Sequence, residues 1–332
     1  MQTQTWADLF QIQPLASKII TNSIKRNRIS HAYLFQGPRG SQKKMFAIHF
    51  AMTLFCKKRQ VLDPCYECPN CKRIYSRNFP DVYWIEPDGQ SIKNEQIKAL
   101  RNEFVHTGVE SAKKVYIIDR AETLTINATN RILKFLEEPD TDLVAILLTD
   151  NGQKILPTIR SRCQLIDFRS LDERTFQEVL LKQKDLSLNE REAILLSALT
   201  KDLDEALELH ESKKVYELKE IIIELIYLLI TKRKERYLYI HEKWLPQMKE
   251  RNDFVQSLDL LLLAVRDILT VKLTNMSNTS FFHREDAFLK RSVTQFSQEQ
   301  LLNKIENILE AKRKIESNVH PTLVMEQLVL KL

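Results

Sequence analysis

The second half of this 332-residue chain has almost none of the residues that interrupt helices. All five glycines lie in the first 152 residues, and only Pro246 and Pro321 of the ten prolines lie beyond Pro157. Glycine and proline are the least favourable residues inside a helix. We therefore predict an α/β part on the N-terminal side, followed by a largely helical part.

Long apolar runs are also missing. The most apolar stretch, residues 221–230, is broken by Glu224 and is too short to span a bilayer. Residues 1–10 lack the basic stretch and apolar stretch of a secretory signal. We expect a cytosolic chain without a membrane span, in a compartment that keeps thiols reduced.

A strong excess of positive charge is absent as well. Lysine and arginine number 50 against 44 acidic residues, which leaves a net charge of +6. Charges of both signs are interspersed, so the chain as a whole is not a polybasic nucleic-acid binder, although a local basic patch is compatible with this balance. The length suggests two or three domains.

The N-terminal part alternates between short apolar runs and helical patterns. Strands are expected at residues 33–36, 82–85, 115–118, 143–148 and 164–168, and helices at 45–55, 96–104 and 130–138. This alternation predicts a parallel sheet covered by helices. Beyond Arg169 the pattern is helical throughout. Shorter helices are expected at 175–182, 190–199 and 203–209, and longer amphipathic ones at 215–239, 254–273, 298–315 and 322–330.

Four of the five cysteines form a C-x8-C-x2-C-x2-C cluster, Cys56, Cys65, Cys68 and Cys71. Four thiolates match the tetrahedral preference of zinc and leave no open position for catalysis, so a structural zinc ion is predicted. Two alternatives are four unligated thiols and an iron–sulfur cluster. Ferredoxin-type runs continue with a further cysteine at the position that is Tyr75 here.

The segment Gly37 to Lys44 follows an expected strand and precedes an expected helix, as a phosphate-binding loop does. A working loop reads G-x-x-x-x-G-K-[ST], in which the lysine meets the phosphates and the hydroxyl ligates Mg²⁺. Gly37 and Lys43 fit, whereas Gln42 replaces the second glycine and Lys44 replaces the hydroxyl. We interpret the segment as a degenerate phosphate loop; the alternative is a coincidental match.

The apolar run 115–118 ends in Asp119, where an acidic residue helps hold Mg²⁺ in such sites. The next residue is Arg120, which cannot act as a base. Together with Gln42 and Lys44, this predicts that Gly37, Lys43 and Asp119 form a vestigial nucleotide site. ATP hydrolysis is expected to be lost, while nucleotide binding is left open.

Arg162 lies in a Ser-Arg-Cys motif just before the last expected strand. In the functional interpretation it is an arginine finger, which neutralises the charge developing on a neighbour's γ-phosphate and contributes a factor of roughly 10³ to 10⁵ in rate. In the structural interpretation it is a surface residue or part of a structural ion pair.

Three stretches accompany these motifs: Ile-Ser-His-Ala-Tyr-Leu-Phe at 29–35, Asn-Arg-Ile-Leu-Lys-Phe-Leu-Glu-Glu-Pro at 130–139 and Ile-Arg-Ser-Arg-Cys at 159–163. With the four cysteines, they resemble the bacterial clamp-loader ATPases, which belong to the AAA+ proteins. The resemblance covers residues 29–163; the helical remainder is compatible with it but less specific.

In that family, motor subunits keep an intact phosphate loop and a glutamate after the strand-end aspartate. A non-hydrolysing kind of subunit tends to lose both and keeps Ser-Arg-Cys. Gln42, Lys44 and Arg120 place this chain with the second kind. The resemblance then implies that Arg162 faces the ATP of an adjacent motor subunit.

The resemblance also implies three domains. These are an AAA+ (P-loop NTPase-like) core at 1–168 with a zinc module at 56–71, a helical lid at 169–211, and an all-α collar at 212–332 that joins five subunits in a ring. The implied partners are motor subunits of the gamma/tau type, a clamp-opening delta subunit and, through the complex, the sliding clamp and primer–template DNA of the DNA polymerase III holoenzyme. No membrane is involved.

Lys98 and Arg101, on an expected core helix, are hypothesised to lie near DNA phosphates; a solvated helix face is the alternative. Three other functions remain open at this point. The chain could be an active ATPase of the same family, a stand-alone zinc module that binds nucleic acid, or a scaffold in which Arg162 is idle. The modest net charge disfavours the stand-alone zinc module.

Overall fold

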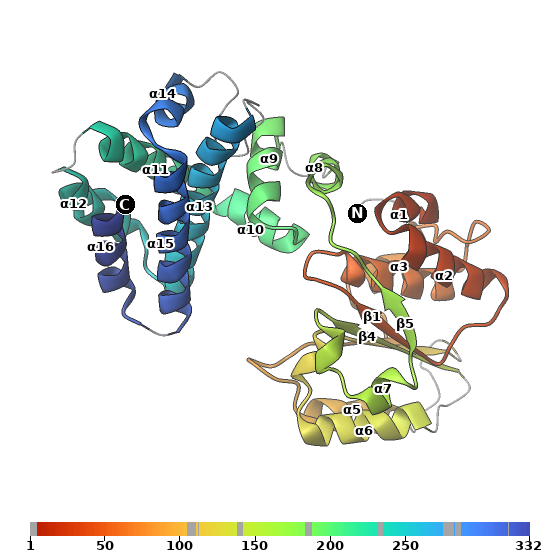
Figure 1. The fold of residues 1–332 in the computed structure, drawn as a ribbon. Coiled ribbons are helices and arrows are strands. Elements are labelled where there is room, and N and C mark those ends of the chain that lie inside the picture. The colour runs from red at the N-terminus through yellow and green to blue at the C-terminus, as the bar shows by residue number, and fades with distance from the viewer. Residues whose placement is uncertain are drawn as a thin grey trace. The chain divides into compact units, whose positions relative to one another are not determined.

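A five-stranded parallel sheet forms the centre of the first of two units into which the chain divides (Figure 1). The computed structural model describes residues 5–104, 111, 113–137, 142–182, 188–231, 235–274, 282, 287–317 and 319–332. The two units are Met1–Thr175 and Phe176–Leu332.

The strands lie in the order β2-β3-β4-β1-β5, and every neighbouring pair is parallel. Their bounds are β1 Ala32–Gln36, β2 Val82–Ile85, β3 Lys114–Ile118, β4 Leu143–Thr149 and β5 Gln164–Asp167. All five expected strands are confirmed within two residues at each end. Apolar runs without polar alternation indicated strands buried on both faces, and β3 and β4 are buried along their whole length.

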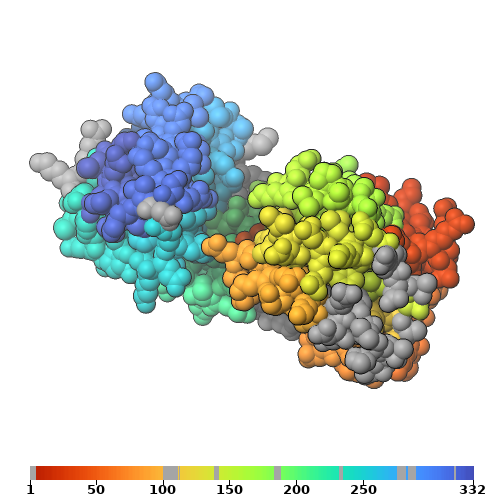
Figure 2. Space-filling view, turned by 90° about the horizontal axis from the view of Figure 1, so that it is seen from below, coloured from red at the N-terminus to blue at the C-terminus, as the bar shows by residue number. Residues whose placement is uncertain are grey.

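Helices cover both faces of the sheet (Figure 1). The helices of this unit are α1 Trp6–Ile12, α2 Pro14–Lys25, α3 Lys43–Phe55, α4 Pro69–Tyr75, α5 Asn94–Phe104, α6 Ile126–Glu137 and α7 Pro157–Arg160. Successive strand side chains point to opposite faces. Accordingly Tyr33 and Phe35 of β1 pack with α1 to α4, whereas Ala32 and Leu34 pack with α5 to α7. Figure 2 views the molecule from the side of α5 to α7, coloured orange to yellow-green.

The first two helices were not predicted from the sequence, although their start signals are present. Thr5 and Asp8 form a capping box at α1, in which the Thr5 side chain accepts from the Asp8 N–H and the Asp8 carboxylate accepts from the Thr5 N–H. Pro14 is the first residue of α2, a position that tolerates the missing N–H. Gln13 separates the two helices; its side-chain amide donates to the backbone oxygens of Ser41 and Arg169.

The second unit is helical, as the lack of glycine and proline predicted. Helix α8 Glu173–Leu181 leads into it, and the others are α9 Glu190–Leu199, α10 Leu203–Ser212, α11 Lys214–Thr231, α12 Glu235–Tyr239, α13 Arg251–Thr274, α14 Ala287–Gln295, α15 Gln298–Glu316 and α16 Pro321–Lys331. The long helix α13 packs against α15 and α11. Trp244 is fully buried, and its indole N–H donates to the Ser257 hydroxyl. The expected α/β class with a helical C-terminal part is therefore confirmed.

Within the described ranges, no helix combines the length and the apolarity needed to cross a membrane.

Gly37 is required by a close approach between two strands. A Cβ atom built on Gly37 would lie 2.2 Å from the carbonyl oxygen of Phe168, which follows β5. No side chain fits at such a distance without a backbone shift. The glycine at the start of the phosphate-loop segment thus has a packing reason that is independent of nucleotide.

We expect Gly37→Ala to lower the free energy of unfolding by about 2 to 3 kcal/mol, the cost of forcing an extra carbon into a packed region. Urea unfolding of the full chain measures it. Gly89→Ala is the matched control, because nothing lies within 4 Å of its Cβ position and its φ of +68° adds only backbone strain of about 1 kcal/mol. Equal losses in the two variants would contradict the steric explanation.

Candidate nucleotide and metal sites

Three carboxylates follow three neighbouring strands at the carboxyl edge of the sheet. Glu86 follows β2, Asp119 follows β3 and Asp150 follows β4, while the phosphate-loop segment follows β1. Open parallel sheets bind ligands at this edge. The segment 37–44 and the predicted Asp119 therefore come together as the sequence predicted, with two further acidic residues beside them.

Lys43, the lysine that would meet a phosphate, is buried and engaged within the chain. Its Nζ donates to the carbonyl oxygens of Gly37 at 2.6 Å and Pro38 at 3.0 Å, and to Asp150 Oδ1 at 2.8 Å. Only 8% of its side chain is exposed. A triphosphate that recruited this ammonium would have to break contacts that already satisfy it.

Lys44 occupies the role that a divalent cation has in a working site. Its Nζ lies 2.8 Å from Asp119 Oδ2 and 3.6 Å from Glu86 Oε1. Partial burial disfavours the ammonium, but the hydrogen bond to Asp119 and the charges of Asp119 and Glu86 outweigh burial and raise the pKa of Lys44. Asp119 is thus neutralised by a positive charge from the segment that follows β1.

The loop keeps its backbone shape although the second glycine is absent. Gln42 has φ 69°, the left-handed conformation that favours glycine, and it is buried. In a working loop this position is glycine, which lets the backbone approach phosphate closely. Arg120, directly after Asp119, is exposed and also left-handed, with φ 50°. No carboxylate stands at this position to activate water.

The four clustered cysteines form one group whose sulfur atoms all lie within 4.8 Å of one another. A tetrahedron with metal–sulfur distances of about 2.3 Å needs sulfur atoms just under 4 Å apart, so the group fits a single tetrahedral ion. Cys56 caps the end of α3, and Cys68 caps the start of α4, which contains Cys71. None of the five cysteines forms a disulfide, and Cys163 lies in the core on the opposite face of the sheet.

Backbone N–H groups point at the sulfur atoms. The N–H of Cys65 donates to Cys56 Sγ at 3.3 Å, and that of Cys68 to Cys65 Sγ at 3.3 Å. Burial disfavours the Cys68 thiolate, but the N–H groups of Cys71 and Lys57 outweigh it and lower the pKa of Cys68 to about 6. Burial raises the pKa of the Cys71 thiol. Donors of this kind stabilise thiolate ligands, which is the form that a metal ion requires.

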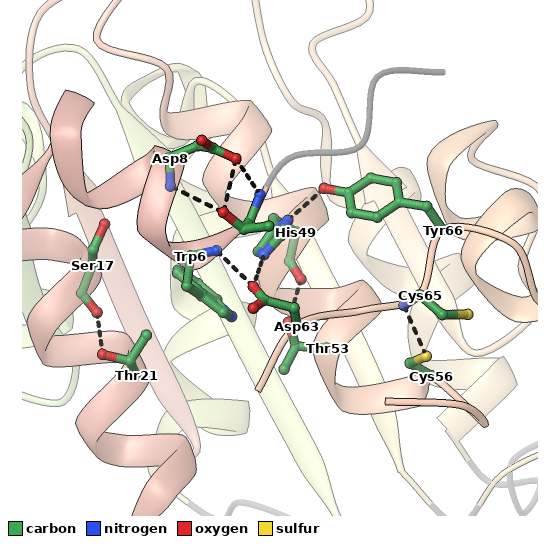
Figure 3. Close-up of polar contacts among 11 residues, drawn as sticks. Trp6, Asp8, Ser17, Thr21, His49, Thr53, Cys56, Asp63, Cys65 and Tyr66 are labelled. Atoms are coloured by element: carbon green, nitrogen blue, oxygen red, sulfur yellow. Dashed lines mark hydrogen bonds and ion pairs between the residues drawn. The ribbon is translucent and has the colours of Figure 1, made fainter. Parts of the chain in front are cut away.

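The cysteine segment is joined to the core through a buried histidine of α3 (Figure 3). His49 Nδ1 lies 2.6 Å from the hydroxyl of Tyr66, which stands between Cys65 and Cys68. Burial lowers the pKa of His49 to about 3, so the ring is neutral at physiological pH. The indole of Trp6 packs edge-on against the His49 ring, with the ring centroids 4.6 Å apart, and the backbone N–H of Trp6 donates to Asp63 Oδ1 at 2.6 Å.

Arg162 lies apart from both sites, in the turn after α7. Its guanidinium lies 3.0 Å from Glu137 Oε1 and donates to the Thr158 carbonyl oxygen at 3.0 Å. The side chain is 36% exposed and Glu137 is 47% exposed. The internal ion pair considered from the sequence is therefore present, and solvent still reaches the guanidinium.

Lys98 is exposed on α5. The side chain of Arg101 lies outside the described residues, so the pair is known only by its place on this helix.

Several residues of these sites were missed from the sequence. Glu86 directly follows an expected strand, the same signal that identified Asp119, and Asp150 lies two residues after the end of another. Glu137, the partner of Arg162, and His49, the partner of Tyr66, had no local signal, because each meets a residue distant in the chain.

Comparison with known proteins gives relatives for the first unit and for the whole chain. A family model described as "DNA polymerase III, delta subunit" matches residues 12–172. The Bacillus subtilis protein named DNA polymerase III subunit delta' is 39% identical over 330 residues, which cover 99% of this chain and 98% of that protein. The B. subtilis DNA polymerase III subunit tau is 40% identical over 156 residues, covering 47% of this chain and 27% of tau.

Among solved structures, a DNA polymerase III gamma subunit-related protein from Thermotoga maritima has a similar fold. The superposition has a TM-score of 0.50 at 18% identity and covers 95% of this chain and 97% of that one. At this identity the likeness concerns the fold alone. It agrees with the expected AAA+ class of parallel sheet and helices.

Removing the Lys44 ammonium should leave the buried Asp119 carboxylate without its cation. We expect Lys44→Ala to lower the free energy of unfolding by about 1 kcal/mol or more, measured by urea unfolding. The control is Lys93→Ala, because the Lys93–Asp88 pair is exposed on both sides and should contribute less than about 0.5 kcal/mol. A Lys44 variant as stable as the parent would show that the pair does not neutralise the site.

Proposed function

Because the chain belongs to the family of DNA polymerase III delta' subunits, we propose that it acts in a clamp loader as a subunit that does not hydrolyse ATP. In this role it completes the active site of a neighbouring motor subunit with Arg162. The single observation that carries the proposal is that two sites of the chain differ in how fully their cations are engaged within it. The nucleotide site is filled by the chain's own lysines, whereas an arginine on another surface remains partly open to solvent.

Loss of hydrolysis follows from three features of the site. Lys44 pairs with Asp119, where a metal ion would bind, and Lys43 is held by loop carbonyls and Asp150. Arg120 takes the position after Asp119 and supplies no base. Phosphoryl transfer depends on a bound metal ion and an oriented water, and the residues for both tasks are replaced or occupied.

Arg162 is suited to act in trans because its present partner is weak. The pair with Glu137 is partly exposed on both sides, and exposed pairs contribute about 0 to 1 kcal/mol. A γ-phosphate with developing negative charge is a stronger partner for a guanidinium. The finger can therefore exchange Glu137 for a neighbour's nucleotide at little cost.

The proposed partners are motor subunits of the gamma/tau type and a delta subunit, with the sliding clamp and primer–template DNA reached through the complex. The three-part division into core 1–168, lid 169–211 and collar 212–332 belongs to this proposal, as does a cytoplasmic location. Lys98 and Arg101 on α5 are proposed DNA contacts; the exposure of Lys98 is compatible with that role.

We further propose that the metal at the four cysteines is zinc in a structural role. Cys56, Cys65, Cys68 and Cys71 supply a complete tetrahedral set, so the ion would bind no substrate. Bound zinc would hold the end of α3 and the start of α4 together across the intervening loop.

The arginine prediction is tested in a loader reconstituted with its motor and delta subunits. We expect Arg162→Ala to reduce DNA- and clamp-stimulated ATP turnover by a factor of roughly 10³ for the site that Arg162 completes. Lys154→Ala, an exposed cation eight residues upstream, should leave turnover unchanged. The chain alone should show no turnover. Size-exclusion chromatography verifies that both variants assemble.

Unchanged turnover with the assembled Arg162 variant would reduce the arginine to a structural residue and the chain to a scaffold. Turnover by the isolated chain would instead favour an active ATPase.

Variants of two buried cysteines, one inside the cluster and one outside it, test the metal prediction. We expect the purified chain to contain one equivalent of zinc by elemental analysis, and Cys71→Ser to lose it. Its thermal midpoint should fall by about 10 °C, because metal binding contributes directly to folding. Cys163→Ser, at a buried cysteine outside the cluster, should keep the zinc. A metal-free chain with the midpoint of the parent would refute the structural role, and iron with sulfide would identify the alternative cluster.

A further inference from the structure

The loop between the first two cysteines has an exposed basic surface that no site described above uses. Lys57, Lys58 and Arg59 follow Cys56 directly, and all three are exposed. Lys72, on α4 of the same module, is exposed as well. We call these four residues the basic surface of the cysteine module.

The cysteine module carries a local excess of positive charge. Residues 56–77 contain six basic and two acidic residues, in a chain whose total net charge is +6. The balanced composition of the full sequence hides it.

Some basic side chains of the module pack against aromatic rings, and others do not. The guanidinium of Arg73 lies over the ring of Phe79 at 5.4 Å, and that of Arg77 over the ring of Trp84 at 4.5 Å. Arg77 also pairs with Glu86 at 2.9 Å. The four side chains of the basic surface, by contrast, make no hydrogen bond or ion pair with any residue that the structure describes.

The loop is held in a strained, fixed shape. Gln60 and Asp63 exchange two backbone hydrogen bonds, of 3.1 and 2.9 Å, across a tight turn. Val61 in this turn is 88% exposed and has φ 56°, a left-handed conformation that β-branched residues rarely adopt. Such strain persists where surrounding contacts impose it, and it concentrates at functional sites.

Those contacts are visible at the base of the loop. Asp63 accepts the Trp6 N–H at 2.6 Å, and Tyr66 is held by His49, so the turn is fastened to α1 and α3 (Figure 3). The N–H of Cys65 donates to Cys56 Sγ and closes the loop at its ends. The basic residues are thus presented from a rigid support, which reduces the entropy lost when they bind a partner.

We propose that the basic surface of the cysteine module contacts the phosphate backbone of nucleic acid. Exposed, unpaired lysine and arginine side chains without a surrounding pocket suit sequence-independent phosphate contacts. Protein interfaces are depleted in lysine, and three of these four residues are lysine, so an acidic protein partner fits less well. The proposal stands apart from the role of Arg162, because it concerns a different surface and a different ligand.

Neutralisation of a metal–thiolate site is the alternative use of these cations. The backbones of Lys57 and Lys58 contact the cysteine sulfurs, whereas their side chains are exposed to solvent, where charge–charge interactions are strongly screened. Loss of the side-chain charge should therefore leave the metal in place.

The test uses the full chain and fluorescein-labelled single-stranded DNA, titrated by fluorescence anisotropy from 25 to 200 mM salt. We expect Lys57→Gln/Lys58→Gln/Arg59→Gln to weaken binding about tenfold at low salt. Three lost phosphate contacts should also reduce the slope of log K against log salt by about 2. Zinc content and thermal midpoint should stay those of the parent.

The matched control neutralises three exposed cations at the end of α2, Lys25, Arg26 and Arg28, and changes the net charge by the same amount. An equal loss of binding in both triple variants would overturn the proposal in favour of a general charge effect. Unchanged DNA binding would overturn it as well. A fall in zinc content would then assign the cations to the metal site, and failure to assemble with the other subunits would assign them to a protein partner.

Failure of this proposal is distinguishable from failure of the proposed function. The triple variant keeps Arg162 and the lysines of the nucleotide site, so the reconstituted loader should retain its basal ATP turnover. Charge reversal at Lys98 and Arg101 in the same assay separates the basic surface from the proposed contacts on α5.

Discussion

The positive charges of Lys43 and Lys44 balance the carboxylates at the carboxyl edge of the sheet, and this balance determines what the site can do. A parallel sheet brings strand ends together, and here three successive strands end beside Glu86, Asp119 and Asp150. Carboxylates gathered at one edge need cations. In a working ATPase, Mg²⁺ and the phosphate-bound lysine fulfil part of that need. In this chain the loop itself supplies both cations, so the edge of the sheet is stable without a ligand.

Lys43 also fastens the segment that follows β1. It bonds to the carbonyl oxygens of Gly37 and Pro38, and the preceding residue, Gln42, has a left-handed backbone. At the start of the segment, Phe168 leaves no room for a side chain on Gly37. Residues 37–44 thus form a folded structural element with its own stabilising contacts.

The cysteine module is part of the core of the first unit and not an appended domain. Its Tyr66 bonds to His49 within α3, its Asp63 bonds to the first turn of α1, and its Ile74 packs in the core above the sheet. The cysteine cluster and α1 are therefore linked through contacts that are distant in sequence. The exposed cations of the module lie on its solvent side, where a partner can reach them. Its buried side packs in the core of the first unit.

Much of the fold could be predicted from the sequence because its signals are local. Apolar runs located all five strands, the scarcity of glycine and proline predicted the helical second unit, and cysteine spacing predicted the cluster whose sulfur atoms the fold brings together. Pairings across the sheet could not be predicted in this way, since residues such as Lys43 and Asp150 meet only after strands distant in sequence become neighbours. Helices α1, α2 and α4 were not predicted; at 7, 12 and 7 residues they are marginal in isolation, and packing within the unit stabilises them. The sequence by itself determined which residues depart from the motifs of a working ATPase. Only the tertiary structure decided that Lys44 lies against Asp119, that Arg162 pairs with Glu137 and that His49 bonds to Tyr66. Each of these contacts joins groups that become neighbours only in the completed fold.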